Sequence, residues 1–273
     1  MPPPHRATLR AAMRPQGTYP LPVAKRLIEQ WCRTSLVITP SEYVATELRR
    51  MGVSQVRVIL NAVDLRAFSP APRDGRLMAE LGIENTATVI AYIGNLNERK
   101  RPLDIVRSSV QVLARCPDVV YLIIGEGPLR EEAMATSRAL GVEAKFRFVD
   151  WQRYEHIPKY INLADLVVLP SFGEGLARVY LEAQACARVL IASDILPARE
   201  VVEHGETGLL FPVGDVDALA QRCIQAAVAP LLRARLGQAA LERVQRHDIR
   251  AAVPRYLSAF ETIVRSSAPS SRR

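Results

Sequence analysis

The chain reads Leu166-Val167-Val168-Leu169-Pro170-Ser171-Phe172-Gly173-Glu174-Gly175-Leu176-Ala177-Arg178-Val179-Tyr180-Leu181-Glu182 at the point that decides its fold. The four apolar residues 166–169 predict a buried parallel strand that ends at Pro170. Two glycines bracket Glu174, and the pattern becomes helical from Leu176. A helix that begins at the carboxyl end of a strand points free N–H groups into the crevice above the sheet, so this stretch predicts a phosphate site.

Two glutamates in this stretch are candidates to bind the rest of such a ligand. Glu174 and Glu182 are eight residues apart, so one lies in the loop and the other on roughly the same side of the helix. Because carboxylates only accept hydrogen bonds, two of them beside a phosphate-binding helix end suit a ligand with phosphate and hydroxyl groups. The alternative is a pair of solvated surface glutamates, the usual environment of this residue type.

The composite of strand, Pro-Ser, Gly-Glu-Gly and second Glu resembles the E-x7-E signature of retaining glycosyltransferases with the GT-B architecture, the family-4-like group. Three later segments are similar to the C-terminal, donor-binding half of that family: Val189-Leu190-Ile191-Ala192-Ser193-Asp194, Arg199-Glu200-Val201-Val202 and His204-Gly205-Glu206-Thr207-Gly208-Leu209-Leu210-Phe211. The likeness runs from about Ser35 to about Val264.

The resemblance implies a role for each part of the opening stretch. Glu174 would be the catalytic-site glutamate that bonds hydroxyls of the transferred sugar, and Glu182 would bond the ribose hydroxyls. The backbone N–H groups near Leu176 and Ala177 would meet the diphosphate. The donor-binding residues that it implies in this loop also include Phe172, Gly173 and Gly175.

A second loop is expected at the same crevice and reads Gly94-Asn95-Leu96-Asn97-Glu98-Arg99-Lys100. In the family, an arginine just after the glycine and a lysine further on reach the donor diphosphate. Lys100 matches the lysine, whereas Asn95 stands where the arginine is expected, so Arg99 or Arg101 is the candidate replacement. Cationic side chains form strong charge-assisted bonds to phosphate oxygens. The alternative is that these basic residues are a solvated entry to the next helix.

A third loop, Gly125-Glu126-Gly127-Pro128, follows another apolar run. Its place between two family-like segments makes Gly125 and Gly127 candidates for a close approach to the nucleotide. A plain turn from strand to helix explains a lone Gly-x-Gly equally well.

The pattern of the whole chain predicts an α/β fold: a Rossmann-like, doubly wound parallel sheet with helices on both faces and a helical C-terminus. The predicted strands cover residues 88–93, 119–124, 146–149, 166–169, 189–192 and 208–211. The predicted helices include residues 102–116, 129–140, 155–163, 198–203, 216–228, 231–246 and 249–264. Ala187 ends the helix that follows Leu176, and its Cβ predicts that it does not form a left-handed cap.

Residues 35–64 predict two short strands with a helix over 42–51 and end in Asn61-Ala62-Val63-Asp64. They are similar to the segment that ends the family's N-terminal, acceptor-binding domain, where the last residues read Asn-Gly-Val-Asp. About 34 residues come before this segment, too few for two βαβ units, so the acceptor domain is expected to be largely missing. The predicted parts are a basic leader with an amphipathic helix (1–34), a domain remnant with linker (35–70), a nucleotide-sugar-binding domain (71–265) and a tail (266–273).

The composition is that of an ordinary globular protein. The chain has 273 residues, of which 49% are hydrophobic and 23% charged. No apolar run reaches the length of a membrane span, and the N-terminus has no apolar core typical of a secretory signal. The four cysteines lie far apart and are interpreted as reduced thiols of a cytoplasmic protein: Cys32, Cys116, Cys186 and Cys223.

Positive charge is concentrated at the front of the chain. The net charge is +8, and residues 1–50 supply five of these charges, with eight Lys and Arg against three acids. A basic front end suits peripheral contact with an anionic membrane surface, and a solvated leader is the alternative. Nucleic acid is the least favoured partner, because aromatic residues, which would stack on bases, make up only 6% of the chain.

The predicted function is that of the donor-binding domain of a retaining hexosyltransferase, which moves a sugar from a nucleotide sugar to an acceptor and needs a separate acceptor-domain protein. The resemblance implies no metal and no other cofactor, because helix N-termini and Lys or Arg would offset the leaving diphosphate. The four histidines are scattered and form no metal-ligand spacing. The alternatives are a non-catalytic nucleotide-sugar-binding or scaffold protein, and a related GT-B epimerase or phosphorylase.

Overall fold

A computed structural model describes residues 36–267 of the chain, with side chains up to residue 264. The leader predicted over 1–34, with its amphipathic helix, lies outside the described residues, as does most of the predicted tail. The chain divides between Ile59 and Leu60 into two compact units, which are described separately.

The smaller unit contains one β-α-β unit. Strand β1 (Val37–Thr39) pairs in parallel with β2 (Val56–Val58), and α3 (Glu42–Arg50) connects them. The hydroxyl of Ser41 accepts a hydrogen bond of 3.3 Å from the N–H of Val44, so Ser41 is the N-cap of α3. The predicted order of strand, helix and strand is correct in this unit.

The larger unit is built on a six-stranded parallel sheet, as predicted. Its strands are β3 (Thr88–Ile93), β4 (Val119–Ile124), β5 (Phe146–Val149), β6 (Leu166–Leu169), β7 (Val189–Ser193) and β8 (Leu209–Phe211). Their order across the sheet is β5-β4-β3-β6-β7-β8, and every pair is parallel. Four of these strands, β4, β6, β7 and β8, are buried at every residue, because helices cover both faces of the sheet.

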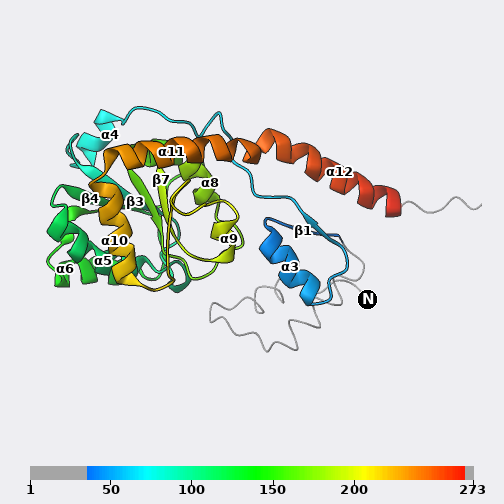
Figure 1. Ribbon diagram of the computed structural model, residues 1–273, viewed down its shortest axis with the longest axis horizontal. Helices are drawn as coiled ribbons and strands as arrows, with labels where there is room; N and C mark the ends of the chain where they lie inside the picture. The colour runs from blue at the N-terminus through cyan, green and yellow to red at the C-terminus, as the bar shows by residue number, and fades with distance from the viewer. Residues whose placement is uncertain (1–35, 268–273) are drawn as a thin grey trace, which may run out of the picture. The chain divides into compact units, whose positions relative to one another are not determined.

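The helices form a layer on each face of the sheet (Figure 1). One layer contains α5 (Pro102–Arg115), α6 (Arg130–Ala139) and α10 (Val216–Ala227), with α5 packed against the other two. The other contains α7 (Ile157–Leu163), α8 (Arg178–Ala185) and α11 (Pro230–Val244), with α8 packed against the other two. Three further helices are α4 (Gly75–Glu80), α9 (Leu196–Arg199) and α12 (Ile249–Ser267), and α12 leads away from the sheet beyond α11. Short 3-10 turns cover Glu98–Lys100, Glu143–Lys145, Tyr154–His156 and Gln245–His247.

Two local predictions need correction. The short helix predicted over 198–203 is α9, which begins earlier and covers Leu196–Arg199. Pro197 lies in its first turn, where proline favours helix initiation. Ala187 does adopt the left-handed conformation, with φ of 54°, despite its Cβ. A Cβ on Gly237 would lie 2.3 Å from the carbonyl oxygen of Ala187, so close packing of α11 holds the strained residue in place.

The order of the strands creates a switch point between β3 and β6. The chain leaves β3 toward β4 on one side and leaves β6 toward β7 on the other. In sheets of this type, ligands bind in the crevice outside the carboxyl ends of the strands at such a point. The loops after β3 and β6 are the two that the sequence assigns to phosphate and sugar binding.

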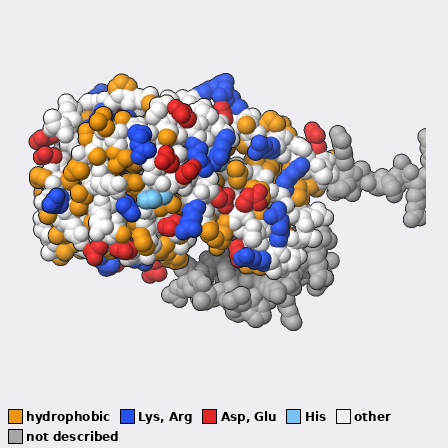
Figure 2. Space-filling model, in the orientation of Figure 1, with side chains coloured by type: hydrophobic (Ala, Val, Ile, Leu, Met, Phe, Trp, Pro, Cys, Tyr) orange, Lys and Arg blue, Asp and Glu red, His pale blue; other side chains and the backbone are white. Residues whose placement is uncertain are grey.

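The surface of the described residues mixes charge of both signs. Figure 2 shows Lys and Arg interspersed with Asp and Glu on the visible face, with hydrophobic side chains between them. Many of the arginines are paired, as in the Arg76–Glu80 ion pair of 3.0 Å and the Arg243–Glu203 pair of 2.7 Å. Within residues 36–267, no helix is both long enough and apolar enough to cross a membrane.

Candidate functional site

The loops after β3 and β4 are joined by backbone hydrogen bonds. The N–H of Leu96 donates to the carbonyl of Glu126 at 2.8 Å, and the N–H of Leu129 donates to the carbonyl of Leu96 at 2.9 Å. A Cβ on Gly125 would lie 2.1 Å from the carbonyl oxygen of Gly94, and a Cβ on Gly127 only 2.4 Å from that of Leu96. Only glycine allows this approach, so the Gly-x-Gly segment has a packing reason at both positions.

The loops after β3 and β6 are joined by a cluster of charged side chains. The N–H of Phe172 donates to the carbonyl of Arg99 at 3.0 Å. The Arg99 guanidinium donates to the carbonyl of Gly173 and to Oε2 of Glu174, both at 2.7 Å. Nζ of Lys100 lies 2.6 Å from Oε1 of the same carboxylate. The predicted phosphate-binding cations and the predicted sugar-binding glutamate therefore occupy one cluster.

Glu174 is held ionised in this cluster. Its side chain is only 6% exposed and that of Lys100 is 13% exposed. Burial by itself raises the pKa of the Glu174 carboxyl, but the bonds to Lys100 and Arg99 outweigh it and lower the pKa below its usual range. The solvated loop glutamate, one alternative from the sequence, is not what the structure contains.

Arg101 belongs to a different interaction. It sits between the 3-10 turn Glu98–Lys100 and α5 with φ of 51°. Its guanidinium donates to both oxygens of Asp104, at 2.6 and 3.2 Å. Of the two candidate replacements for the arginine expected at Asn95, only Arg99 joins the Glu174 cluster.

A pocket of about 600 Å³ opens beside this cluster, at the carboxyl ends of β3, β4 and β5. Its walls contain five of the predicted site residues: Gly94, Asn95, Gly125, Gly127 and Glu182. Its other lining residues were not predicted: Ile93, Ile124, Glu126, Trp151, Gln152, Tyr154, Ile157, Arg178 and Val179. The predicted residues outside its lining are Arg99, Lys100, Phe172, Gly173, Glu174, Gly175, Leu176 and Ala177.

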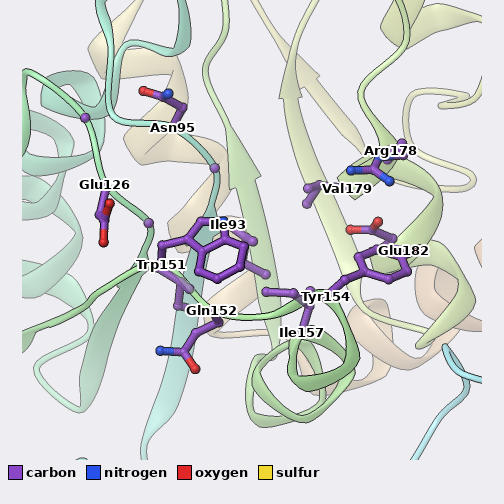
Figure 3. Close-up of a pocket in the computed structure, with 14 residues that line it drawn as sticks. Ile93, Asn95, Glu126, Trp151, Gln152, Tyr154, Ile157, Arg178, Val179 and Glu182 are labelled. Atoms are coloured by element: carbon purple, nitrogen blue, oxygen red, sulfur yellow. The ribbon is translucent and has the colours of Figure 1, made fainter.

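Glu182 faces this pocket from α8. Figure 3 shows Glu182, Tyr154 and Arg178 gathered on one side, Glu126 on the other, and Trp151 between them. Glu182 is 3% exposed, so it is not the surface glutamate of the alternative interpretation. Burial raises the pKa of its carboxyl to about 7, against the opposing effects of the Arg178 charge and a hydrogen bond from Tyr154.

Tyr154 connects Glu182 to the mouth of the pocket. Its hydroxyl hydrogen-bonds the Glu182 carboxyl, and burial together with that carboxyl raises the pKa of Tyr154 to about 12. The Arg178 guanidinium lies over the Tyr154 ring, 5.3 Å from its centroid, in a cation–π contact. Arg178 is exposed and also lines the pocket.

Trp151 is the most prominent lining residue that the sequence reasoning missed. It is 64% exposed and follows β5, whose end lies at the same edge of the sheet. The rule that selected the other loops, a position just after the carboxyl end of a parallel strand, applies equally to Asp150-Trp151-Gln152 and could have found them. An exposed indole beside a pocket offers an apolar face on which a flat ring can stack.

Helix α8 begins at this crevice without a side-chain cap. Its N-cap is Ala177, whose side chain has no hydrogen-bonding group. The first N–H groups of an α-helix have no partner one full turn earlier in the helix. In α8 the N–H of Tyr180 donates to the carbonyl of Ala177 at 3.1 Å, so the available donors are the N–H groups that come before it. No group of three or more His, Cys, Asp or Glu arranged to hold a metal ion occurs among the described residues.

Comparison with known families accounts for this arrangement. Residues 74–243 match the family described as glycosyl transferases group 1. The chain belongs to this family. The match covers the six-stranded sheet with the loops after β3, β4 and β6, and the fold is that of the GT-B glycosyltransferases, as the sequence predicts.

Individual glycosyl transferases are similar over much of the chain. The D-inositol 3-phosphate glycosyltransferase of Kribbella flavida is 30% identical over 224 residues, which are 79% of this chain and 53% of that protein. The sucrose-phosphate synthase of Thermosynechococcus elongatus superposes with a TM-score of 0.80 at 25% identity, over 96% of this chain and 66% of that one. Anabaena HepE in complex with UDP-glucose superposes with a TM-score of 0.78 at 25% identity, over 89% of this chain and 67% of that one. The chain spans about half the length of the curated relatives it matches.

Proposed function

We propose that this chain binds a nucleotide sugar at the switch point and provides the donor half of a glycosyl-transfer site. The observation that carries the proposal is the Glu174 cluster, in which two cations from the loop after β3 surround a buried carboxylate from the loop after β6. Such a cluster supplies both charge for a diphosphate and an acceptor for hydroxyls. The Anabaena relative that contains UDP-glucose has the same fold, which agrees with this class of ligand.

The pocket and the cluster would divide the ligand between them. The nucleobase would stack on Trp151 near Gln152, and the ribose hydroxyls would donate to Glu182. The diphosphate would lie between Lys100 and the start of α8. The transferred sugar would then reach Glu174, whose carboxylate accepts hydrogen bonds from its hydroxyls.

Binding would exchange the partners of the two cations. In the structure, Arg99 and Lys100 already neutralise Glu174. A diphosphate carries more negative charge than one carboxylate, so it attracts the same cations more strongly. Glu174 would be released from part of its ion pairing at the moment when a sugar hydroxyl arrives to replace it.

The proposed reaction is transfer of a hexose with retention of the anomeric configuration. The bond between the anomeric carbon and the diphosphate oxygen would break, and its electron pair would leave with the diphosphate. A bond to the oxygen of an acceptor hydroxyl would form on the same face of the sugar, and the hydroxyl proton would pass to the departing diphosphate. The E-x7-E pattern of Glu174 and Glu182 carries the expectation of retention. The acceptor would be held by a separate domain, in line with the larger size of the relatives.

The chain is tested first for donor binding. Calorimetry at low salt with UDP, GDP and ADP, followed by the corresponding sugar nucleotides, should give saturable heat with one nucleotide series. No heat and no thermal shift with any of them contradicts the proposal. Transfer is then assayed together with an acceptor-binding domain, and NMR of the product reads the anomeric configuration. Donor binding without transfer would instead favour a non-catalytic nucleotide-sugar-binding protein.

The proposal assigns the diphosphate charge to protein groups alone, without a metal. Arg99, Lys100 and the N–H groups at the start of α8 would offset it. Donor affinity is therefore expected to be the same in EDTA and in magnesium. A requirement for a divalent ion would overturn this part of the proposal and leave the donor class intact.

A further inference from the structure

One residue outside the lining of the pocket contacts the start of α8 directly. Nδ2 of Asn61 donates a hydrogen bond of 2.6 Å to the carbonyl of Leu176, which is 115 residues away in sequence. Asn61 lies just after the boundary between the two units. Leu176 is 5% exposed and comes immediately before Ala177, the N-cap of α8.

Asn61 is itself fixed by the segment between α11 and α12. Nδ1 of His247 lies 3.2 Å from the carbonyl oxygen of Asn61. The N–H of Val63 donates to the carbonyl of His247 at 2.9 Å, and the N–H of Ile249 donates back to Val63 at 3.0 Å. Residues 61–63 are thus clamped against residues 247–249, so the amide of Asn61 approaches Leu176 from a fixed position.

His247 holds Asn61 as a neutral ring. Burial lowers the pKa of His247, the hydrogen bond with Asn61 opposes this, and the charges of Arg246 and Arg243 lower the pKa further. Nε of Arg246 donates to Nε2 of the ring at 3.3 Å, which leaves Nδ1 as the protonated nitrogen. Nδ1 therefore donates to the Asn61 carbonyl.

The contact with Leu176 determines the direction of a neighbouring donor. The peptide bond between Leu176 and Ala177 is planar and trans, so its C=O and its N–H point to opposite sides. Because Asn61 holds the carbonyl on one side, the N–H of Ala177 is held on the other. Without Asn61, the carbonyl of Leu176 would lose this donor, and the peptide would be free to rotate toward another partner.

We propose that Asn61 is a positioning residue for donor binding, which turns the N–H of Ala177 toward the diphosphate. The inference rests on the proposed function, because it assigns that N–H to a phosphate. Asn61 touches no ligand and acts through the peptide that joins Leu176 to Ala177. Its place between the clamp at 247–249 and the start of α8 ties the linker residues to the phosphate end of the donor site.

The test separates phosphate binding from nucleoside binding. Calorimetry on the full chain measures the nucleoside diphosphate that the wild type binds, among UDP, GDP and ADP, and the matching nucleoside. Asn61→Ala is expected to lower the affinity for the diphosphate about tenfold, which is equivalent to the loss of one well-formed hydrogen bond. Affinity for the nucleoside should change less than about twofold. Asn61→Asp, which has the same shape but no N–H donor, is expected to show the same selective loss.

Asn162→Ala is the matched control. Asn162 is also a buried amide that holds a loop, since it bonds the N–H of Ala71 and the carbonyl of Ser69, but it lies outside the site. This change should lower the melting temperature and leave the ratio of the two affinities unaltered. Should Asn61→Ala fail to fold, Asn61→Ser carries the test, because its hydroxyl retains a donor with less reach and should give a smaller loss of the same kind.

The outcomes distinguish the inference from the function on which it rests. A wild-type chain that binds none of the three diphosphates contradicts the proposed function. A wild type that binds, with Asn61 variants that lose diphosphate and nucleoside equally or lose neither, overturns the positioning role and leaves donor binding in place.

Discussion

Lys100 and Glu174 form an ion pair of 2.6 Å in which neither side chain is more than 13% exposed. They come from loops that follow different strands, β3 and β6, and meet at the switch point of the sheet. A pair this buried is not a surface salt bridge, and removing either partner changes the charge balance of the cluster that it forms with Arg99. Each partner therefore has a measurable and different expected effect on ligand binding.

Lys100→Ala should weaken the binding of a nucleoside diphosphate by roughly 1.5–3 kcal/mol, the usual contribution of a hydrogen bond to a charged group. Nucleoside affinity should change little, because Lys100 is assigned to the phosphates. Calorimetry with both ligands checks this, and Lys159→Ala, at an exposed position on α7, is the control. Equal losses for both ligands would show that Lys100 acts through folding.

Glu174→Gln should not lower the affinity for the diphosphate. The change removes the carboxylate that engages Arg99 and Lys100, so both cations become more available, and affinity is expected to stay level or rise a few-fold. Transfer activity should fall, because a neutral amide accepts sugar hydroxyls less strongly. A Glu174→Gln chain that binds the diphosphate more weakly than the wild type would contradict the proposed exchange of partners.

Ribonucleoside affinity should rise with pH through about 7. The pKa of Glu182 is about 7, so below that value its carboxyl is mostly protonated and accepts hydrogen bonds poorly. Above it, the carboxylate accepts from both ribose hydroxyls. Titrations between pH 6 and 8 check this with the nucleoside, which avoids ionisation of the phosphates. Glu182→Gln should bind about tenfold more weakly than the wild type at pH 8 and show no pH dependence.

A 2′-deoxynucleoside isolates the contact with Glu182. It lacks one of the two hydroxyls and should bind the wild type weakly, with little further loss in Glu182→Gln. Comparing both ligands on both proteins forms a cycle that removes general effects of the mutation. If Glu182→Gln weakens both nucleosides equally, Glu182 is not the ribose ligand.

The stability of the ligand-free chain should fall as pH rises, because of Glu182, whereas nucleoside affinity rises over a similar pH range. Burial raises the pKa of the Glu182 carboxyl in the folded state to about 7, from an ordinary value of 4.5 in the unfolded chain. Between these pH values the folded state binds more protons than the unfolded state, so the free energy of unfolding decreases as pH rises. Denaturant titrations should show this slope in the wild type relative to Glu182→Gln from pH 5 to 7 and no difference in slope above pH 8.

Trp151→Ala should lower the affinities for the nucleoside and for the nucleoside diphosphate by the same factor. The indole is assigned to the nucleobase, which both ligands share, and stacking of one base on an aromatic side chain contributes roughly 1–3 kcal/mol. Fluorescence of the wild type should be quenched on binding, and the quenching should be lost in Trp151→Ala. A selective loss of the diphosphate would place Trp151 near the phosphates instead.

The sequence by itself determined the sheet and the loops that carry the site. Apolar runs such as Leu166–Leu169 are strands buried on both faces, and their alternation with helices permits few arrangements other than a doubly wound sheet. The loops at the carboxyl ends of the predicted strands can therefore be chosen as candidate site residues before any side-chain contact is known. The same rule, applied to the end of β5, would have included Trp151.

Only the tertiary structure decided which side chains meet. The bonds of Glu174 to Arg99 and of Asn61 to Leu176 join residues 75 and 115 positions apart, and no local periodicity encodes such distances. Burial of Glu182, and with it the raised pKa, depends on how α8 packs against the sheet. The left-handed Ala187 shows the same limit, since its cost is outweighed by packing on a distant glycine. Local sequence fixes the period of each element, whereas contacts between loops depend on the order and twist of strands that are far apart in the chain.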